Sequence, residues 1–277
     1  RLLASKRSAG KEIAFMGKTY TVEEATFDSF KGIDIALFAG GSISKDFAPH
    51  AVKAGAVVID NSSAFRMDPE VPLVVPEVNP QAILKHKGII ANPNCSTIIM
   101  VMALKPIYDL AKIKRVIVST YQAVSGAGKE GIDELDAQVR EHSEGREMTA
   151  NILPSASAEK HYPIAFNLIP QIDVFCDNLY TKEEMKMVNE TKKIMEDYEM
   201  RITATTIRVP VYRSHSESVN IELEKEVDLG AMREALAKFP GVTVQDDPSK
   251  QEYPMPLYTS EKDDVYVGRL RRDESCE

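Results

Sequence analysis

The first third of the chain alternates short apolar runs with polar stretches that are typical of helices. Three of the apolar runs are nearly continuous and lie at residues 33–39, 56–60 and 88–91. Such runs are typical of strands that are buried on both faces of a parallel sheet. Gly40-Gly41-Ser42 predicts a turn after the first run, and residues 44–54 predict a helix that stops at Gly55. Strand, glycine-rich turn, helix and strand in this order form a βαβ unit.

The pattern changes near Cys95. Helical periodicity is predicted at residues 98–110, 130–142 and 183–198, and strands at 115–121, 203–211 and 216–222. The last two strands alternate apolar and polar positions like an antiparallel pair. Because strands and helices no longer alternate strictly, we expect an α+β domain here. The fold class is therefore α/β, with a parallel-sheet domain at residues 1–94 and an α+β domain at 95–277.

The composition favours a soluble globular protein and argues against a membrane, secreted or nucleic-acid-binding protein. Of the 277 residues, 43% are hydrophobic and 27% are charged, as in soluble globular proteins. No apolar run approaches the roughly 20 residues of a membrane span, and no secretion signal opens the chain. The net charge of -8 argues against nucleic acid as a partner. Three scattered cysteines fit a reducing, cytoplasmic compartment.

Small polar loops follow the predicted strands of the first domain. In parallel sheets the ligand lies at the carboxyl ends of the strands, where backbone N–H groups are available to bind phosphate. These ends carry residues 4–8, Gly40-Gly41 and residues 61–63. The GxGxxG fingerprint is absent, so in a dinucleotide fold the chain would start near the second strand. Ser5, Arg7 and Ser8 would then lie at the adenosine ribose, where Arg7 favours NADP over NAD.

Cys95 lies in the turn Asn92-Pro93-Asn94-Cys95-Ser96-Thr97, between a strand and a helix. Ser96 and Thr97 are candidates to cap that helix. A thiol at a helix N-terminus is favoured as thiolate, the form that attacks carbonyl carbon. Position alone leaves open whether Cys95 is a nucleophile or a small packed side chain.

His215 is the best base candidate among the five histidines, because Arg208 and Arg213 are near it in sequence. Strand periodicity puts Arg208 and His215 on opposite faces unless an irregularity near Pro210 intervenes. Ser125-Gly126-Ala127-Gly128 is either a phosphate or nicotinamide loop or a plain turn. Residues 61–66, which end in a cation, either bind phosphate or form an ordinary loop. No metal-ligand spacing occurs, so no metal site is predicted.

These segments together resemble the aspartate-β-semialdehyde dehydrogenase family. The matching stretches lie at residues 4–11, 39–42, 58–67, 74–79, 92–97, 119–128, 165–173 and 208–217. They are spread over nearly the whole chain in the family's order. The resemblance implies a Rossmann-type NADP domain and a catalytic and dimerisation domain. It also implies NADP-dependent conversion of aspartyl-β-phosphate to aspartate-β-semialdehyde through a cysteine thioester, in lysine, methionine and threonine biosynthesis.

The resemblance assigns roles to residues. It implies Cys95 as nucleophile, His215 as acid/base, Gln122 as the residue that orients the intermediate, and Asn94 as an oxyanion contact. For substrate binding it implies Arg208 at the carboxylate, Glu183 at the amino group (with Glu184 adjacent), and Arg66 and Lys186 at the phosphate. For NADP it implies Ser5, Arg7, Ser8, Gly40, Gly41, Ser125 and Gly126. A homodimer or a dimer of dimers is the implied assembly.

The ends of the chain depart from the family's pattern. The first strand with its glycine-rich turn and a long closing helix are expected outside residues 1–277. For these residues alone we therefore expect weak or no NADP binding and a destabilised first domain. One alternative is the related N-acetyl-glutamyl-phosphate reductase, against which Asn94 argues because that enzyme has glycine before the cysteine. The other is a non-catalytic truncated dimerisation module.

Overall fold

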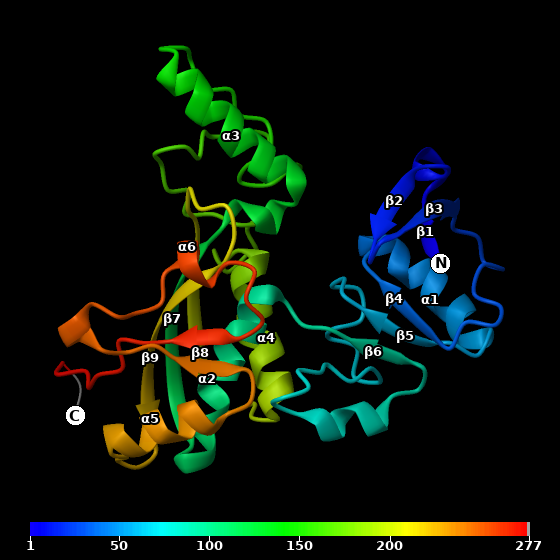
Figure 1. Ribbon diagram of the computed structural model, residues 1–277. Helices are drawn as coiled ribbons and strands as arrows, with labels where there is room; N and C mark the ends of the chain where they lie inside the picture. Colours follow the sequence, from blue (N-terminus) through cyan, green and yellow to red (C-terminus); the bar gives the residue numbers. More distant parts are fainter. Residues whose placement is uncertain (276–277) are drawn as a thin grey trace. The chain divides into compact units, whose positions relative to one another are not determined.

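The protein is described by a computed structural model, which covers residues 1–275. The chain forms two compact units (Figure 1). The first unit comprises Arg1–Leu73 and Gln81–Asn92, and the second comprises Val74–Pro80 and Pro93–Glu277. The chain therefore passes between the units three times. The predicted domain bounds, residues 1–94 and 95–277, stay a prediction.

The first unit contains the predicted parallel sheet. Strands β4 (Ile35–Phe38), β5 (Val57–Asp60) and β6 (Ile89–Ala91) are parallel in the order β4-β5-β6, with α1 (Ser44–Lys53) connecting the first two. Turn η2 (Gly41–Ile43) precedes α1, and η3 (Pro80–Lys85) precedes β6. The buried core formed by this sheet and the elements packed on it comprises Phe30, Ala36, Ala48, Ala51, Ala56 and Val58. The predicted strands, turn and helix are thus confirmed.

A second sheet of the first unit departs from the sequence prediction. Strand β1 (Leu2–Ala4) is parallel to β3 (Lys18–Glu24), and β2 (Glu12–Phe15) is antiparallel to β3. The short helix η1 (Lys6–Ser8) follows β1. No strand was predicted for residues 12–24. Met16 and Gly17 both have positive φ, 47° and 74°, which closes a two-residue hairpin.

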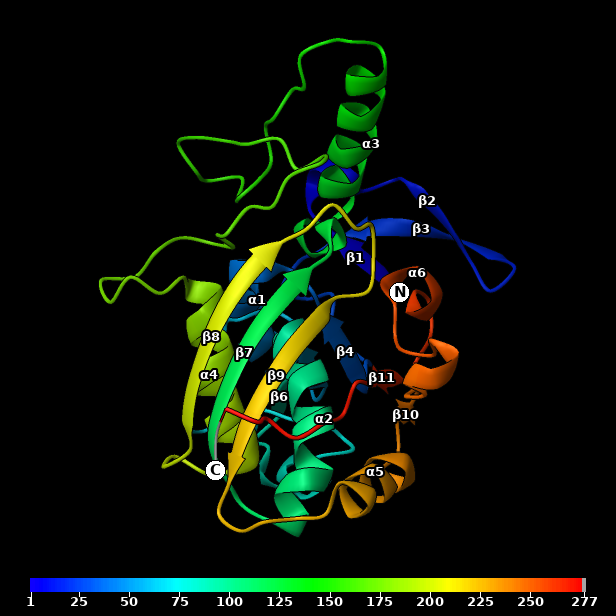
Figure 2. The same ribbon diagram turned by 90° about the vertical axis from the view of Figure 1, so that its left-hand side faces the viewer.

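The second unit is built on a three-stranded sheet in the order β8-β7-β9 (Figure 2). The central strand β7 (Ile113–Gln122) is parallel to β8 (Arg201–Arg208) and antiparallel to β9 (Ser216–Leu223). The predicted strands exist, but β8 and β9 do not pair with each other as expected. Alternation identifies a half-buried strand but not its neighbour, and β7 lies between them.

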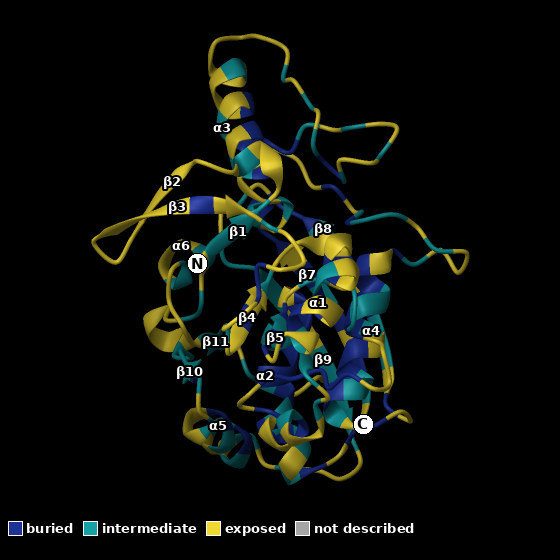
Figure 3. Ribbon diagram, turned by 90° about the vertical axis from the view of Figure 1, so that its right-hand side faces the viewer, coloured by how far each residue is buried: buried dark blue, intermediate teal, exposed yellow. Residues whose placement is uncertain are grey.

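Helices α2 (Cys95–Leu110) and α4 (Lys182–Met195) pack on one face of this sheet. The core between them and the sheet consists of Met100, Leu104, Ile113, Val116, Val118, Met187, Met200 and Ala204. In Figure 3 the buried residues gather along both helices. This packing holds the first turns of α2 and α4 beside the carboxyl ends of β7 and β8.

Several smaller elements complete the second unit. They are η4 (Val124–Ala127), α3 (Lys129–Ser143), α5 (Leu229–Lys238), β10 (Val242–Val244), η5 (Pro248–Lys250), α6 (Pro256–Thr259) and β11 (Val265–Val267). Strands β10 and β11 pair in parallel. Cys95 and Cys176 are free thiols, and Cys276 lies outside the described residues. Across residues 1–275, none of the helices combines the length and apolar character needed to cross a bilayer.

Candidate active site

The turn before α2 places Cys95 at the first position of that helix, where it is exposed. Asn94 is the N-cap: its Oδ1 accepts hydrogen bonds from the backbone N of Ser96 at 3.0 Å and of Thr97 at 3.2 Å. The prediction that Ser96 and Thr97 cap the helix was wrong. Asn94 has an extended backbone, and its short side chain reaches the amides two and three residues ahead.

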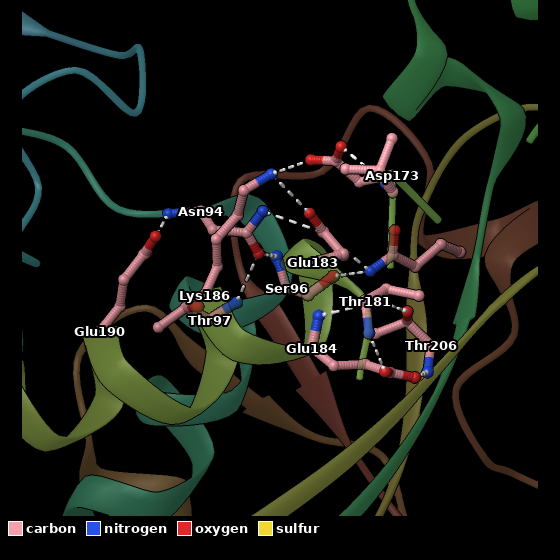
Figure 4. A network of polar contacts seen from close by, with 12 residues as sticks. Asn94, Ser96, Thr97, Asp173, Thr181, Glu183, Glu184, Lys186, Glu190 and Thr206 are labelled. Atoms are coloured by element: carbon pink, nitrogen blue, oxygen red, sulfur yellow. Dashed lines mark hydrogen bonds and ion pairs between the residues drawn. The ribbon is translucent and has the colours of Figure 1, made fainter. Parts of the chain in front are cut away.

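Helix α4 fixes this turn through two acidic side chains (Figure 4). Glu190 Oε2 accepts a hydrogen bond from Asn94 backbone N at 2.6 Å, and Glu183 Oε1 accepts one from Asn94 Nδ2 at 2.9 Å. Residues seven apart lie on the same face of a helix. The main chain and the side chain of Asn94 are thus both bonded to α4, which determines where the adjacent thiol stands.

Glu183 is the centre of the polar network. Besides Asn94, its carboxylate accepts hydrogen bonds from Gln122 Nε2 at 3.2 Å and from Lys186 Nζ at 3.2 Å. Gln122 is buried at the end of β7 and also donates to Ser96 Oγ at 2.6 Å. The side chains of α2, β7 and α4 therefore meet at the carboxylate of Glu183.

The neighbouring Glu184 has a different role. Its carboxylate accepts hydrogen bonds from the backbone N of Thr181 at 2.7 Å and of Thr206 at 2.9 Å. The first of these belongs to a capping box at the start of α4. Glu184 thus binds backbone amides of its own turn and of β8, whereas Glu183 contacts the turn that carries the thiol.

Arg208 ends β8 directly opposite Gln122 of β7. Its guanidinium is buried, and Nη1 donates a hydrogen bond to the carbonyl of Ala123 at 2.7 Å. Burial lowers the pKa of Arg208, while the charges of Glu183 and Cys95 raise it. Among the described residues no group pairs with the buried Nε. An unpaired buried donor of this kind is rare in folded proteins and marks a place where a ligand oxygen would be bound.

His215 precedes β9 in a loop, so the irregularity that the sequence allowed near Pro210 is present, and strand periodicity does not separate His215 from Arg208. Residues 209–215 lie outside both strands, and Ser214 has a φ of 70°. The backbone N of Ala123 donates a hydrogen bond to His215 Nδ1 at 3.0 Å. Because Nδ1 accepts, the neutral ring carries its proton on Nε2. Burial, followed by the positive charge of Arg208, lowers the pKa of His215 to about 4.

Gly126 makes the approach of these two side chains possible. A Cβ at this position would lie 2.7 Å from Arg208 Nη1 and 3.3 Å from His215 Nε2. Ser125 and Gly126 lie in η4, directly after β7. Their predicted contact with the nicotinamide stays a prediction; the structure places Gly126 against the guanidinium and the imidazole.

The electrostatics of the thiol differ from the sequence expectation. Desolvation by the protein around it raises the pKa of Cys95, and the Glu183 carboxylate raises it further. Hydrogen bonds with Ser96 and the charge of Arg208 act in the opposite direction. The expected increase in acidity at the helix N-terminus is therefore wrong for the free protein. A further cation or a base beside the thiol would favour the thiolate.

The remaining predicted residues belong to the first unit. Arg66 is buried and donates hydrogen bonds from Nε to the Asn92 carbonyl and from Nη2 to the Asn61 carbonyl, both at 2.9 Å. It thus joins the loops after β5 and β6. The predicted cofactor residues Ser5, Arg7, Ser8, Gly40 and Gly41 lie in η1 and η2 or at their N-caps.

Sequence reasoning missed Asp173, Ser96 and Glu190 as members of the network. Asp173 lay in a stretch used only for the resemblance, and Glu190 is one acid among the 42 Asp and Glu residues of the chain. The one available signal was the spacing of Glu183 and Glu190 on one helix face. Residues 1–275 contain no group of three or more His, Cys, Asp or Glu side chains arranged to hold a metal ion.

Two family models match the chain. One, described as "Semialdehyde dehydrogenase, NAD binding domain", matches residues 1–86, and the other, "Semialdehyde dehydrogenase, dimerisation domain", matches residues 104–277. They confirm the predicted fold class, a Rossmann-type domain followed by a dimerisation domain.

Individual relatives agree with the family models. The aspartate-semialdehyde dehydrogenase of Aquifex aeolicus is 57% identical over 280 residues, which cover 100% of this chain and 81% of that protein. That of Bacillus subtilis is 56% identical, covering 98% of this chain and 79% of the relative. The crystal structure of aspartate semialdehyde dehydrogenase II from Vibrio cholerae has a TM-score of 0.92 at 46% identity, covering 99% of this chain and 80% of that one. A second structure of that enzyme is described as complexed with ASA.

Proposed function

Because this chain belongs to the aspartate-semialdehyde dehydrogenase family, we propose that it interconverts aspartate-β-semialdehyde and aspartyl-β-phosphate with NADP and phosphate. The observation that carries the proposal is the cluster of Cys95, Gln122, Glu183, Arg208 and His215 in the second unit. It combines a thiol, a proton-transfer group and charges of both signs. Neither a dimerisation module nor a packed thiol requires that combination.

The charges match the substrate. Aspartate semialdehyde carries one carboxylate and one ammonium, and the reaction also uses phosphate. The unpaired Nε of Arg208 favours a bidentate contact with the carboxylate. Glu183 is the proposed partner of the ammonium, and Lys186 is a proposed phosphate contact. The role of Arg66 at the phosphate stays a prediction.

Cys95 and His215 would carry the covalent chemistry. In the oxidative direction the Cys95 thiolate adds to the aldehyde carbon and forms a thiohemiacetal. With Nδ1 bound to the Ala123 amide, His215 presents Nε2–H and donates a hydrogen bond to the developing oxyanion. Once the thiohemiacetal has lost its hydride to the cofactor and become a thioester, phosphate attacks the thioester carbon and Cys95 leaves as thiolate. Gln122, held by Ser96 and Glu183, would orient the covalent intermediate.

The first unit is suited to hold the cofactor. Around η1 it offers the hydroxyls of Ser5 and Ser8 and the exposed guanidinium of Arg7, a donor set that fits a ribose 2′-phosphate. Gly41 has a φ of 64°, and no atom lies within 4 Å of the position its Cβ would take, so its backbone stays open to a ligand. Bound there, NADP+ would supply the hydride acceptor that the oxidation of the thiohemiacetal requires.

The second unit is the proposed site of dimerisation. Its outer sheet face exposes Ile117 and Tyr121, which lie on the same side of β7. Exposed apolar side chains on a sheet face favour contact with a second copy. We propose a homodimer or a dimer of dimers, located in the cytoplasm as the low cysteine content suggests.

The test is the phosphate-dependent reduction of NADP by aspartate semialdehyde, followed by the absorbance of NADPH. With the full reading frame that contains these residues, we expect turnover for the wild type and none for Cys95→Ala. A matched control is Cys176→Ala, which removes the other described thiol and should retain activity. Absence of activity in the wild type, or activity in Cys95→Ala equal to that of the control, would refute the proposal.

A further inference from the structure

Lys186 is held between two carboxylates. Its Nζ donates hydrogen bonds to Asp173 Oδ2 at 3.0 Å and to Glu183 Oε2 at 3.2 Å (Figure 4). An ammonium has three donors, so these bonds use two of them and fix the direction of the third. Glu183 lies on the same helix as Lys186, whereas Asp173 comes from the loop before it.

The backbone around Asp173 is shaped to hold its carboxylate in place. Asp173 has a φ of 69°, in the left-handed region that aspartate tolerates better than most residues. Its Oδ1 accepts a hydrogen bond from the backbone N of Val174 at 2.8 Å, and its carbonyl accepts one from Gln171 Nε2 at 3.0 Å. One carboxylate oxygen is thus fixed by the loop, and the other is directed at the ammonium. Unusual backbone geometry of this kind is concentrated at functional sites.

The surroundings favour the charged forms of both Asp173 and Lys186. Although burial raises the pKa of Asp173, the hydrogen bonds from Lys186 and Val174 hold it below its ordinary value. Burial lowers the pKa of Lys186, but Glu183 and Asp173 together raise it above its ordinary value. Two carboxylates and one ammonium leave the group with one net negative charge, which opposes the approach of an anion.

We propose that Asp173 is a positioning residue that holds the Lys186 ammonium for phosphate and reduces its affinity for that anion. The inference rests on the proposed function, in which Lys186 contacts phosphate. A weakened phosphate site has a chemical advantage in a reversible reaction, because phosphate must leave after each turnover in the reductive direction. Removing the Asp173 charge should therefore tighten phosphate binding rather than weaken it.

The experiment compares Asp173→Asn with the wild type in the phosphate-dependent reaction. Asparagine keeps an oxygen for the Val174 amide and tolerates the positive φ, but it removes the charge. We expect the KM for phosphate to fall about three- to tenfold, as one partly screened charge would produce, with a smaller change in the KM for aspartate semialdehyde. Asp177→Asn, the same change at an exposed position of the same loop, should leave both values unaltered.

A second variant tests the same inference in case Asp173→Asn disturbs the fold of the loop. Asp173→Gly removes the carboxylate and accepts the left-handed backbone, so it should show the same fall in the phosphate KM. A merely structural role for Asp173 would raise the KM for both substrates and lower the melting temperature. An unchanged or raised phosphate KM in both variants, with an active wild type, would overturn the inference alone. An inactive wild type would instead overturn the proposed function.

Discussion

Gly126→Ala should damage substrate binding through one methyl group. The new Cβ would lie 2.7 Å from Arg208 Nη1, whereas ordinary contacts begin at 3.4 Å. The guanidinium must therefore retreat by about 0.7 Å. We expect this movement to lengthen the 2.7 Å hydrogen bond that Nη1 donates to the Ala123 carbonyl. The φ of Gly126 is outside the left-handed region, so steric contact, not backbone strain, is the cause.

The size of the effect follows from that hydrogen bond. A hydrogen bond that involves a charged group contributes about 1.5–3 kcal/mol, and a tenfold change in rate corresponds to about 1.4 kcal/mol. We expect kcat/KM for aspartate semialdehyde to fall roughly 10- to 150-fold. The change should appear mainly in the KM for the semialdehyde, because Arg208 is the proposed carboxylate contact. The melting temperature should change little, since the displaced atom is the end of a flexible side chain.

Steady-state kinetics with both substrates, together with a thermal melt, would measure this. The control is the same substitution in an Arg208→Lys background, where no Nη1 stands in the way of the methyl group. In that background the alanine should lower kcat/KM for aspartate semialdehyde by less than threefold. The effects of the two substitutions should therefore be strongly non-additive. A kcat/KM for Gly126→Ala within twofold of the wild type, or equal losses in both backgrounds, would refute this reasoning.

Two further predictions concern stability. Glu184→Ala leaves the amides of Thr181 and Thr206 without their acceptor and should lower the free energy of unfolding by about 2–5 kcal/mol, measured in urea, with Glu184→Gln losing about half as much. The fold lowers the pKa of His215 to about 4 from the ordinary 6.5. The neutral imidazole therefore adds to the free energy of unfolding in full above pH 6.5, and this stabilisation is lost as the pH falls towards 4. The free energies of unfolding of the wild type and of His215→Gln should differ by at most about 3 kcal/mol at neutral pH, and this difference should disappear in acid. A difference that does not depend on pH would contradict the assignment.

Local pattern was sufficient for most elements of the fold. Apolar runs and glycine turns predicted β4, α1, β5 and β6, since each is determined by residues close in sequence. Pairing was harder: the alternation in residues 203–211 and 216–222 identified two strands, but their common neighbour β7 is some 80 residues earlier in the chain. The hairpin at Met16-Gly17 was missed because its polar strands lack a strong apolar alternation.

The sequence predicted which residues belong to the candidate site but not which atoms they contact. The resemblance supplied Cys95, Gln122, Arg208 and His215 as residue types. It did not reveal that the Ala123 amide fixes the tautomer of His215, because a backbone group has no signature in sequence. The resemblance also could not separate the role of Glu183 from that of Glu184. These adjacent residues point to different sides of the first turn of α4 and contact different partners.

The short segment Val74–Pro80 has a practical consequence for dissecting the molecule. It belongs to the second unit, although it is flanked on both sides by residues of the first. Val74, Val75 and Val78 are buried, and the side chain of Glu77 lies within 4 Å of the position a Cβ on Gly241 would take. A fragment that starts at Pro93 would therefore leave apolar surface uncovered. A separate peptide of residues 74–80 should bind to that surface and cover it again. The second unit could therefore be reassembled from two pieces, this peptide and a fragment that starts at Pro93.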